Sequence, residues 1–71
     1  MHEYIITLTW DEEAQVWIAV SDDIPIALES GSFDALIERV KITAPEILQL
    51  NQKPHESIQL VFKAERHAVV I

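Results

Sequence analysis

Residues 4–20, YIITLTWDEEAQVWIAV, carry most of the information about how this 71-residue chain folds. Apolar and polar side chains alternate through residues 4–10, and the β-branched and aromatic content there favours a strand. A second apolar run, residues 16–20, predicts a second strand. The acids between the runs then fall in a tight loop of about three to five residues in an antiparallel hairpin. We therefore interpret the acidic cluster as a hairpin tip rather than an active site.

The register of this hairpin decides which side chains are buried. The apolar side chains occupy even positions from 4 to 10 in the first strand and positions 16, 18 and 20 in the second. If both sets share one face, Trp10 lies opposite Val16 and Leu8 lies opposite Ile18. In that register Trp17 turns to the other face.

The rest of the chain predicts two more strands and one helix. Residues 21–23 precede Pro25 and indicate a turn, after which a short strand follows at about residues 26–29. Ser32 is a suitable helix N-cap, and apolar residues recur at helical spacing from Phe33 to about Leu50. Alternation over residues 58–65 predicts a last strand. The result is one α+β domain over residues 1–71, with the order β-β-β-α-β and a mostly antiparallel sheet. A right-handed crossover places the last strand parallel to the first.

One helix covers only one face of such a sheet. In the predicted register the other face exposes Ile5, Trp17, Ala19 and Val61. Apolar patches of this kind commonly mark an interface, although Trp17 could instead be covered by its own C-terminal tail. The apolar tail itself is expected to pair with a sheet edge of the same chain or of a neighbour. We predict a homodimer or higher homo-oligomer. The residues assigned to self-association are Trp17, Ala68, Val69, Val70 and Ile71.

The net charge of −7 is unevenly distributed along the chain. Every acid from Glu3 to Glu38 precedes the first basic residue, Arg39. An acidic surface repels phosphate backbones, so we expect no direct nucleic-acid binding. A basic protein partner suits this surface, and the alternative is that the acids only keep the domain soluble. The sequence predicts neither a secretory signal nor a membrane span, so a cytoplasmic location is expected.

No catalytic residue, cofactor-binding residue or metal ligand is predicted. Metal-dependent cleavage of the RNase H type needs carboxylates that converge at the centre of a sheet. Here Glu3 begins the first predicted strand, the next acids follow its far end, and the strand between them has none. The three histidines, His2, His55 and His67, are widely separated, and no pair has helical ligand spacing. We therefore expect a protein that is not an enzyme.

Three segments together resemble a known group of proteins. They are TWDEEAQVWIAVSDDIP at residues 9–25, ALES at residues 27–30 and FDALIERVKITAPEILQLN at residues 33–51. In this order they resemble the HicB-like antitoxin superfamily, specifically a small single-domain bacterial family of unknown function. The resemblance covers nearly the whole chain. It implies a partial RNase H-like fold, in agreement with the order of elements read from the residues.

The resemblance also implies a partner. HicB is the antitoxin of a toxin–antitoxin pair, and its N-terminal domain blocks HicA, a small basic toxin that cleaves mRNA. The expected contact residues are Asp11, Glu12, Glu13, Asp22 and Asp23. The alternative is a stand-alone homodimeric domain with no toxin partner. Two departures limit the comparison. Ile26 stands where relatives commonly have glycine, and full-length HicB proteins usually continue into a DNA-binding domain, so the resemblance of residues 1–71 implies no operator binding.

Overall fold

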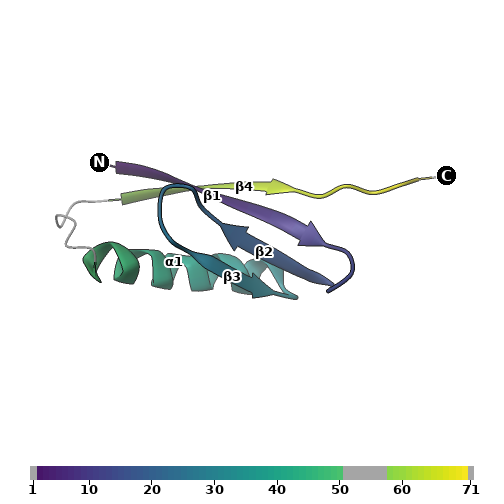
Figure 1. Ribbon diagram of the computed structural model, residues 1–71, viewed down its shortest axis with the longest axis horizontal. Coiled ribbons are helices and arrows are strands. Elements are labelled where there is room, and N and C mark those ends of the chain that lie inside the picture. The colour runs from purple at the N-terminus through teal and green to yellow at the C-terminus, as the bar shows by residue number, and fades with distance from the viewer. Residues whose placement is uncertain (1, 51–57, 71) are drawn as a thin grey trace.

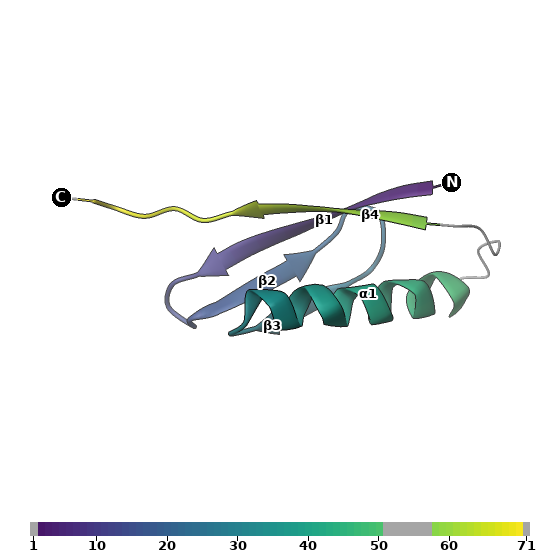
Figure 2. The same cartoon turned by 180° about the vertical axis from the view of Figure 1, so that it is seen from behind.

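The computed structural model describes residues 2–50 and 58–70, and it has the predicted α+β fold. In chain order the elements are β1 (His2–Asp11), β2 (Val16–Val20), β3 (Ala27–Ser30), α1 (Phe33–Leu50) and β4 (Ile58–Glu65). The strands form one sheet in the order β3-β2-β1-β4. Neighbours are antiparallel except β4, which runs parallel to β1 as predicted. Helix α1 lies across one face of the sheet (Figure 1 and Figure 2).

The register of the β1–β2 hairpin differs from the predicted one. Trp10 pairs with Trp17, and Leu8 pairs with Ala19. The cause is the loop at residues 12–15. The N–H of Gln15 donates to the carbonyl of Asp11 at 2.8 Å, and Gln15 has φ 58°, in the left-handed region. This single helical turn sets Asp11 opposite Val16 and shifts every later pair by one residue.

The shift moves Trp17 and Ala19 to the face that α1 covers. Ala19 is fully buried there. Trp17 is half-buried and packs edge-to-face against Phe33, with the ring centroids 4.8 Å apart. The expectation that Trp17 and Ala19 lie on the open face is therefore wrong. The pattern could not distinguish the two registers, because β2 is apolar at every position and offers an apolar set to either face.

The core lies between the sheet and α1. Its buried side chains are Ile6, Leu8, Ala19, Ile24, Ile26, Leu36, Val40, Ala44 and Leu48. The predicted N-cap is confirmed, since Ser32 Oγ accepts a hydrogen bond from the N–H of Ala35 at 3.2 Å. The helix then continues through Pro45.

The turn before β3 accommodates Ile26 at the position where the proteins that the chain resembles commonly have glycine. The N–H of Ile26 donates to the carbonyl of Ile24 at 2.8 Å, and both side chains are buried on either side of Pro25. Within residues 2–50 and 58–70, Gln15 alone has a positive φ, so Ile26 needs no left-handed conformation.

Candidate protein-interaction surface

The acids of the hairpin tip help to build the loop on which they lie. Asp11 Oδ1 accepts hydrogen bonds from the N–H groups of Glu13 and Ala14, at 3.1 and 3.3 Å. The Glu12 carboxylate accepts a hydrogen bond from the indole Nε1–H of Trp10 at 2.5 Å. Of the three acids, only the Glu13 carboxylate makes no such contact with the described part of the chain. Asp11 and Glu12 therefore have structural roles beside any role in binding.

The second acidic turn is held against the middle of β1. Pairing of β1 with β2 stops at Thr7 and Val20, and side chains of the turn continue it. Ser21 Oγ donates to the carbonyl of Ile5 at 2.7 Å, and the N–H of Ile5 donates to Asp23 Oδ2 at 2.9 Å. Neighbouring Asp22 is exposed.

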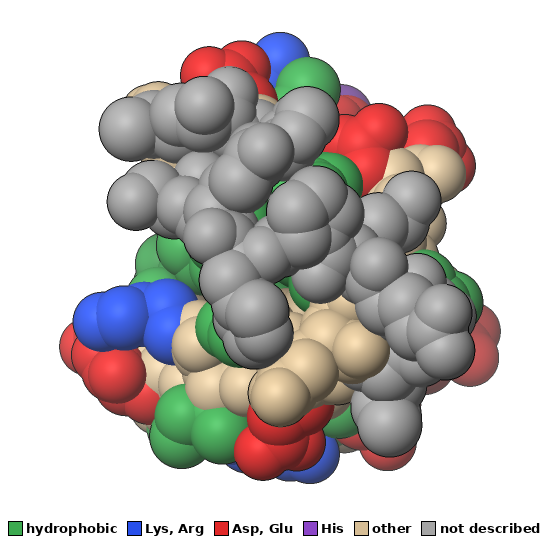
Figure 3. Space-filling view, turned by 90° about the vertical axis from the view of Figure 1, so that its left-hand side faces the viewer, with side chains coloured by type: hydrophobic (Ala, Val, Ile, Leu, Met, Phe, Trp, Pro, Cys, Tyr) green, Lys and Arg blue, Asp and Glu red, His purple; other side chains and the backbone are tan. Residues whose placement is uncertain are grey.

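The structure does not bring the two acidic groups together. Asp23 lies beside Ile5, whereas Asp11 ends the same strand. At roughly 3.3 Å per residue, these positions are about 20 Å apart along β1. Figure 3 views the molecule from the end opposite the hairpin loop and shows acidic side chains at several separate places on that end. The five predicted contact acids thus form two small groups rather than one patch.

The face of the sheet turned away from α1 has an apolar centre. Strand alternation and the observed register place five aliphatic side chains there: Ile5, Val16, Ile18, Val20 and Val61. We call them the open-face cluster. Ile5 is 38% exposed and Val20 is 41% exposed, and no described helix or strand covers them. An uncovered apolar patch on a sheet is typical of an interaction surface.

Three glutamates surround the open-face cluster. Glu3, Glu29 and Glu65 are exposed and point to the same side of the sheet by alternation. Within the described residues, Lys63 is the only Lys or Arg on this side. We call the three glutamates the acidic rim. An apolar centre inside a charged rim is the usual anatomy of a protein-binding surface.

The sequence pattern predicted Ile5 and Val61 on this surface but not Val16, Ile18 and Val20. The missed residues follow directly from the wrong register. A usable signal was present in the loop, because Asp11 followed by residues 12–15 has the form of a capped helical turn. An even number of loop residues then puts Trp17, rather than Val16, on the side of Trp10.

Beyond β4 the described chain continues as an exposed tail. The guanidinium carbon of Arg66 lies 4.3 Å from the centre of a Trp10 ring, a cation–π contact. His67 Nε2 lies 2.5 Å from Glu65 Oε1. Val69 and Val70 are 92% and 91% exposed, and Figure 1 shows the tail running past the hairpin. The tail therefore makes no strand pairing with its own sheet between residues 66 and 70, and Ile71 lies outside the described residues.

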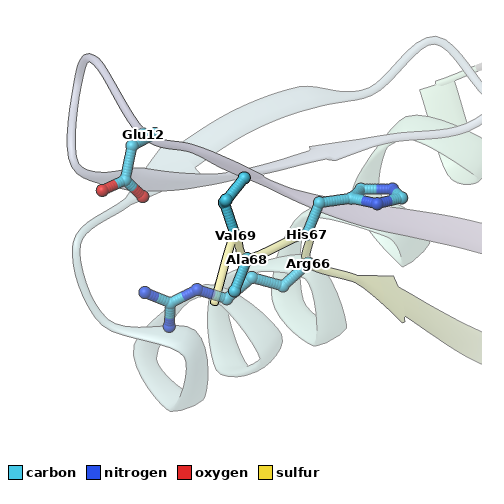
Figure 4. A pocket seen from close by; sticks show the side chains of 5 residues that line it. All are labelled: Glu12, Arg66, His67, Ala68 and Val69. Carbon is cyan, nitrogen blue, oxygen red and sulfur yellow. The ribbon is translucent and has the colours of Figure 1, made fainter. Parts of the chain in front are cut away.

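A shallow hollow of about 440 Å³ lies between the tail and the hairpin loop. It is lined by Glu12, Arg66, His67, Ala68 and Val69 (Figure 4). Across residues 2–50 and 58–70, no group of three or more His, Cys, Asp or Glu is arranged to hold a metal ion. His55 lies outside the described residues. No helix in the described ranges is long and apolar enough to cross a membrane.

These features define a small α+β domain with a half-covered sheet. The chain matches the family "Domain of unknown function (DUF1902)" over residues 3–71, and it belongs to that family. It is also similar to a hypothetical protein of known crystal structure from the extremely thermophilic bacterium Thermus thermophilus. The two are 32% identical with a TM-score of 0.82, and the match covers 97% of this chain and 100% of the other. A search of curated proteins found no match.

Proposed function

We propose that this domain is a non-catalytic protein-interaction module of the HicB antitoxin type, which binds a small basic protein on the open face of its sheet. The observation that carries the proposal is the open-face cluster inside the acidic rim. The partner implied by the resemblance is a HicA-type mRNA-cleaving toxin. Apolar contacts at the centre would hold such a complex, since interface energy concentrates in well-packed central residues.

The charges of the domain serve the encounter with that partner. The net charge of −7 and the acidic rim complement a basic surface. Complementary charges mainly accelerate association and exclude wrong partners. Among the acids of the two turns, Glu13 and Asp22 are free to act this way, whereas Asp11, Glu12 and Asp23 also make local hydrogen bonds.

The central contact is tested by one substitution on each face of the molecule. Val20 belongs to the open-face cluster, and Ile42 is a matched exposed aliphatic residue of α1, 64% exposed. Val20→Asp should raise the Kd for a HicA-like protein encoded beside the gene about tenfold or more. Ile42→Asp should leave it unchanged. Calorimetric titration measures both, with circular dichroism as the folding control. Equal affinities for the two variants would place the contact elsewhere.

The role of charge is tested by kinetics. Replacing Glu13 by Gln and Asp22 by Asn removes two exposed charges without touching the hydrogen bonds of either turn. The double variant should associate more slowly and show a weaker dependence on ionic strength, while its dissociation rate stays the same. The control is Glu46→Gln on α1. An unchanged salt dependence in the double variant would remove the turns from the encounter surface.

The non-catalytic part of the proposal has a direct test. Purified protein should cleave no RNA in the presence of Mg²⁺ or Mn²⁺, because the interior of β1 carries no acid between Glu3 and Asp11. Metal-dependent cleavage that is lost on replacing Asp11 or Asp23 would refute it. Cleavage that survives both replacements indicates a contaminating nuclease.

A stand-alone homodimeric domain is the second candidate. The exposed apolar tail favours it, because Val69 and Val70 gain from burial against another chain. A gene neighbourhood without a small basic protein, together with a tight homodimer in isolation, would favour this candidate over the antitoxin one.

A further inference from the structure

The two edges of the sheet differ in how they are protected. β3 has only four residues, and the carbonyl of its Glu29 accepts a hydrogen bond from Arg39 Nη1 of α1 at 3.0 Å. β4 is twice as long, and its only partner in the described sheet is β1. An edge strand with free N–H and C=O groups is a template for another strand.

The tail keeps the alternation of a strand after β4 ends. Arg66 lies over Trp10, which is on the face of the sheet toward α1. His67 contacts Glu65, which is on the open face. Figure 4 shows the side chains of Arg66 and His67 pointing away from one another. The tail is thus arranged as a continuation of β4 that lacks a neighbouring strand.

We propose that two copies of this chain pair through the outer edges of their β4 strands, antiparallel, about a two-fold axis perpendicular to the sheet that passes midway between Ala64 and its counterpart in the second copy. The tail of each copy then lies along β4 of the other copy. This is a form of strand addition, in which backbone hydrogen bonds join two sheets into one. A two-fold axis makes the contact self-complementary, which is the commonest symmetry of homodimers.

Charge selects this register. With the axis at Ala64, Lys63 lies opposite Glu65 of the second copy, and Glu65 lies opposite Lys63 of the second copy. Moving the axis to Lys63 or to Glu65 puts like charges directly opposite each other, which destabilises a sheet. An axis at Phe62 opposes Lys63 with Val61 and forms no charge pair.

The same register gives the apolar tail a partner. Ala68 lies opposite Leu60 of the second copy, and Val70 lies opposite Ile58 of the second copy. Leu60 and Ile58 pack against the core on the side of α1, so the tail extends that core across the interface. The exposure of Val70 in the single chain is relieved in the pair.

This dimer is independent of the proposed basic partner. An axis perpendicular to the sheet keeps both helices on one side and both open faces on the other. The open-face cluster stays uncovered in each copy. If the protein proves to be monomeric, the proposed function is therefore unaffected. If it binds no basic protein, the proposed dimer is unaffected.

A charge-swap cycle tests the register. Sedimentation equilibrium of the wild type should give a mass of twice 8.1 kDa at micromolar concentration. Lys63→Glu and Glu65→Lys should each raise the dimer dissociation constant about tenfold, because the symmetry reverses two pairs at once. The double variant should restore it. Glu46→Lys, on the exposed side of α1, is the control for the change of charge. A monomeric wild type, or a double variant as weak as the singles, would overturn the proposal.

A second measurement does not depend on charge. The chain has no cysteine, so a single introduced thiol reports on its own position. Ala64→Cys brings two thiols together at the axis and should give a disulfide-linked dimer on mild oxidation, reversed by reductant. Ala27→Cys, exposed on β3 at the opposite edge, should stay largely monomeric. Equal cross-linking at both positions, or none at Ala64, contradicts the β4 interface.

Discussion

The two faces of the sheet are built from the same strands yet meet different surroundings. The face toward α1 carries Ile6, Leu8 and Ala19, which are fully buried. The open face carries Ile5 and Val20, which are aliphatic as well and remain about two-fifths exposed. Hydrophobicity alone therefore does not decide which side of this sheet becomes core. The hairpin loop sets the register, and the helix then selects one of two apolar faces.

The largest expected effect is the difference in unfolding free energy between substitutions of two neighbouring residues, Ile6 and Ile5. Ile6→Ala removes a fully buried side chain and should cost about 3 kcal/mol of unfolding free energy. Ile5→Ala, one position along on the open face, should cost about 1 kcal/mol. Urea denaturation followed by circular dichroism measures both. Similar losses for the two variants would mean that the open face is covered in solution.

An intermediate effect on stability is expected in the loop at residues 12–15, which determines the register of the β1–β2 hairpin. Asp11→Ala removes the acceptor for two loop N–H groups and should cost about 1 kcal/mol. Glu13→Ala, in the same loop, removes an exposed carboxylate and should change stability by less than about 0.5 kcal/mol. Thermal unfolding of the two variants provides the comparison. A stable Asp11→Ala protein would show that the register is set by packing of Trp17 rather than by the loop.

The smallest expected effect lies at the junction between β4 and the tail. Arg66→Gln keeps much of the side-chain length but loses the cation over Trp10, which should cost about 0.5 kcal/mol. It should also change the tryptophan emission of the folded protein. His67→Gln is the control, because His67 contacts Glu65 on the other side of the sheet. If both variants leave the emission unchanged, the Arg66 contact does not persist in solution.

Local signals were enough to predict most of the elements. The second strand was predicted at residues 16–20 and is found at Val16–Val20, and Ser32 caps α1 as its position suggested. The first strand is longer than the predicted residues 4–10. Its start is extended by pairing of His2 with Ile58, a contact between distant parts of the chain that no local pattern contains.

The surface was harder to predict than the fold. The sequence located the acids in two turns, but it did not show that Asp23 would bond to Ile5 while Asp11 bonded within its own loop. Gln15 has a left-handed backbone conformation, which glycine and asparagine adopt far more often than glutamine. Its residue type therefore did not indicate this conformation. Without that conformation, the number of loop residues and hence the register of the hairpin could not be determined, and Trp17 was assigned to the wrong face of the sheet.

The central position of β1 implies an order of assembly. On one side β1 pairs with β2 across the short loop at residues 12–15, and on the other it pairs with β4, after β2, β3 and α1 have intervened. Because the entropy of closing a loop grows with its length, we expect the hairpin to form first and the parallel pairing to complete the fold. Pulsed hydrogen exchange during refolding should then protect amides of β2 before those of β4. Until β4 docks, the edge of β1 that faces β4 has no neighbouring strand, which leaves β1 dependent on a segment that follows β2, β3 and α1 in the chain.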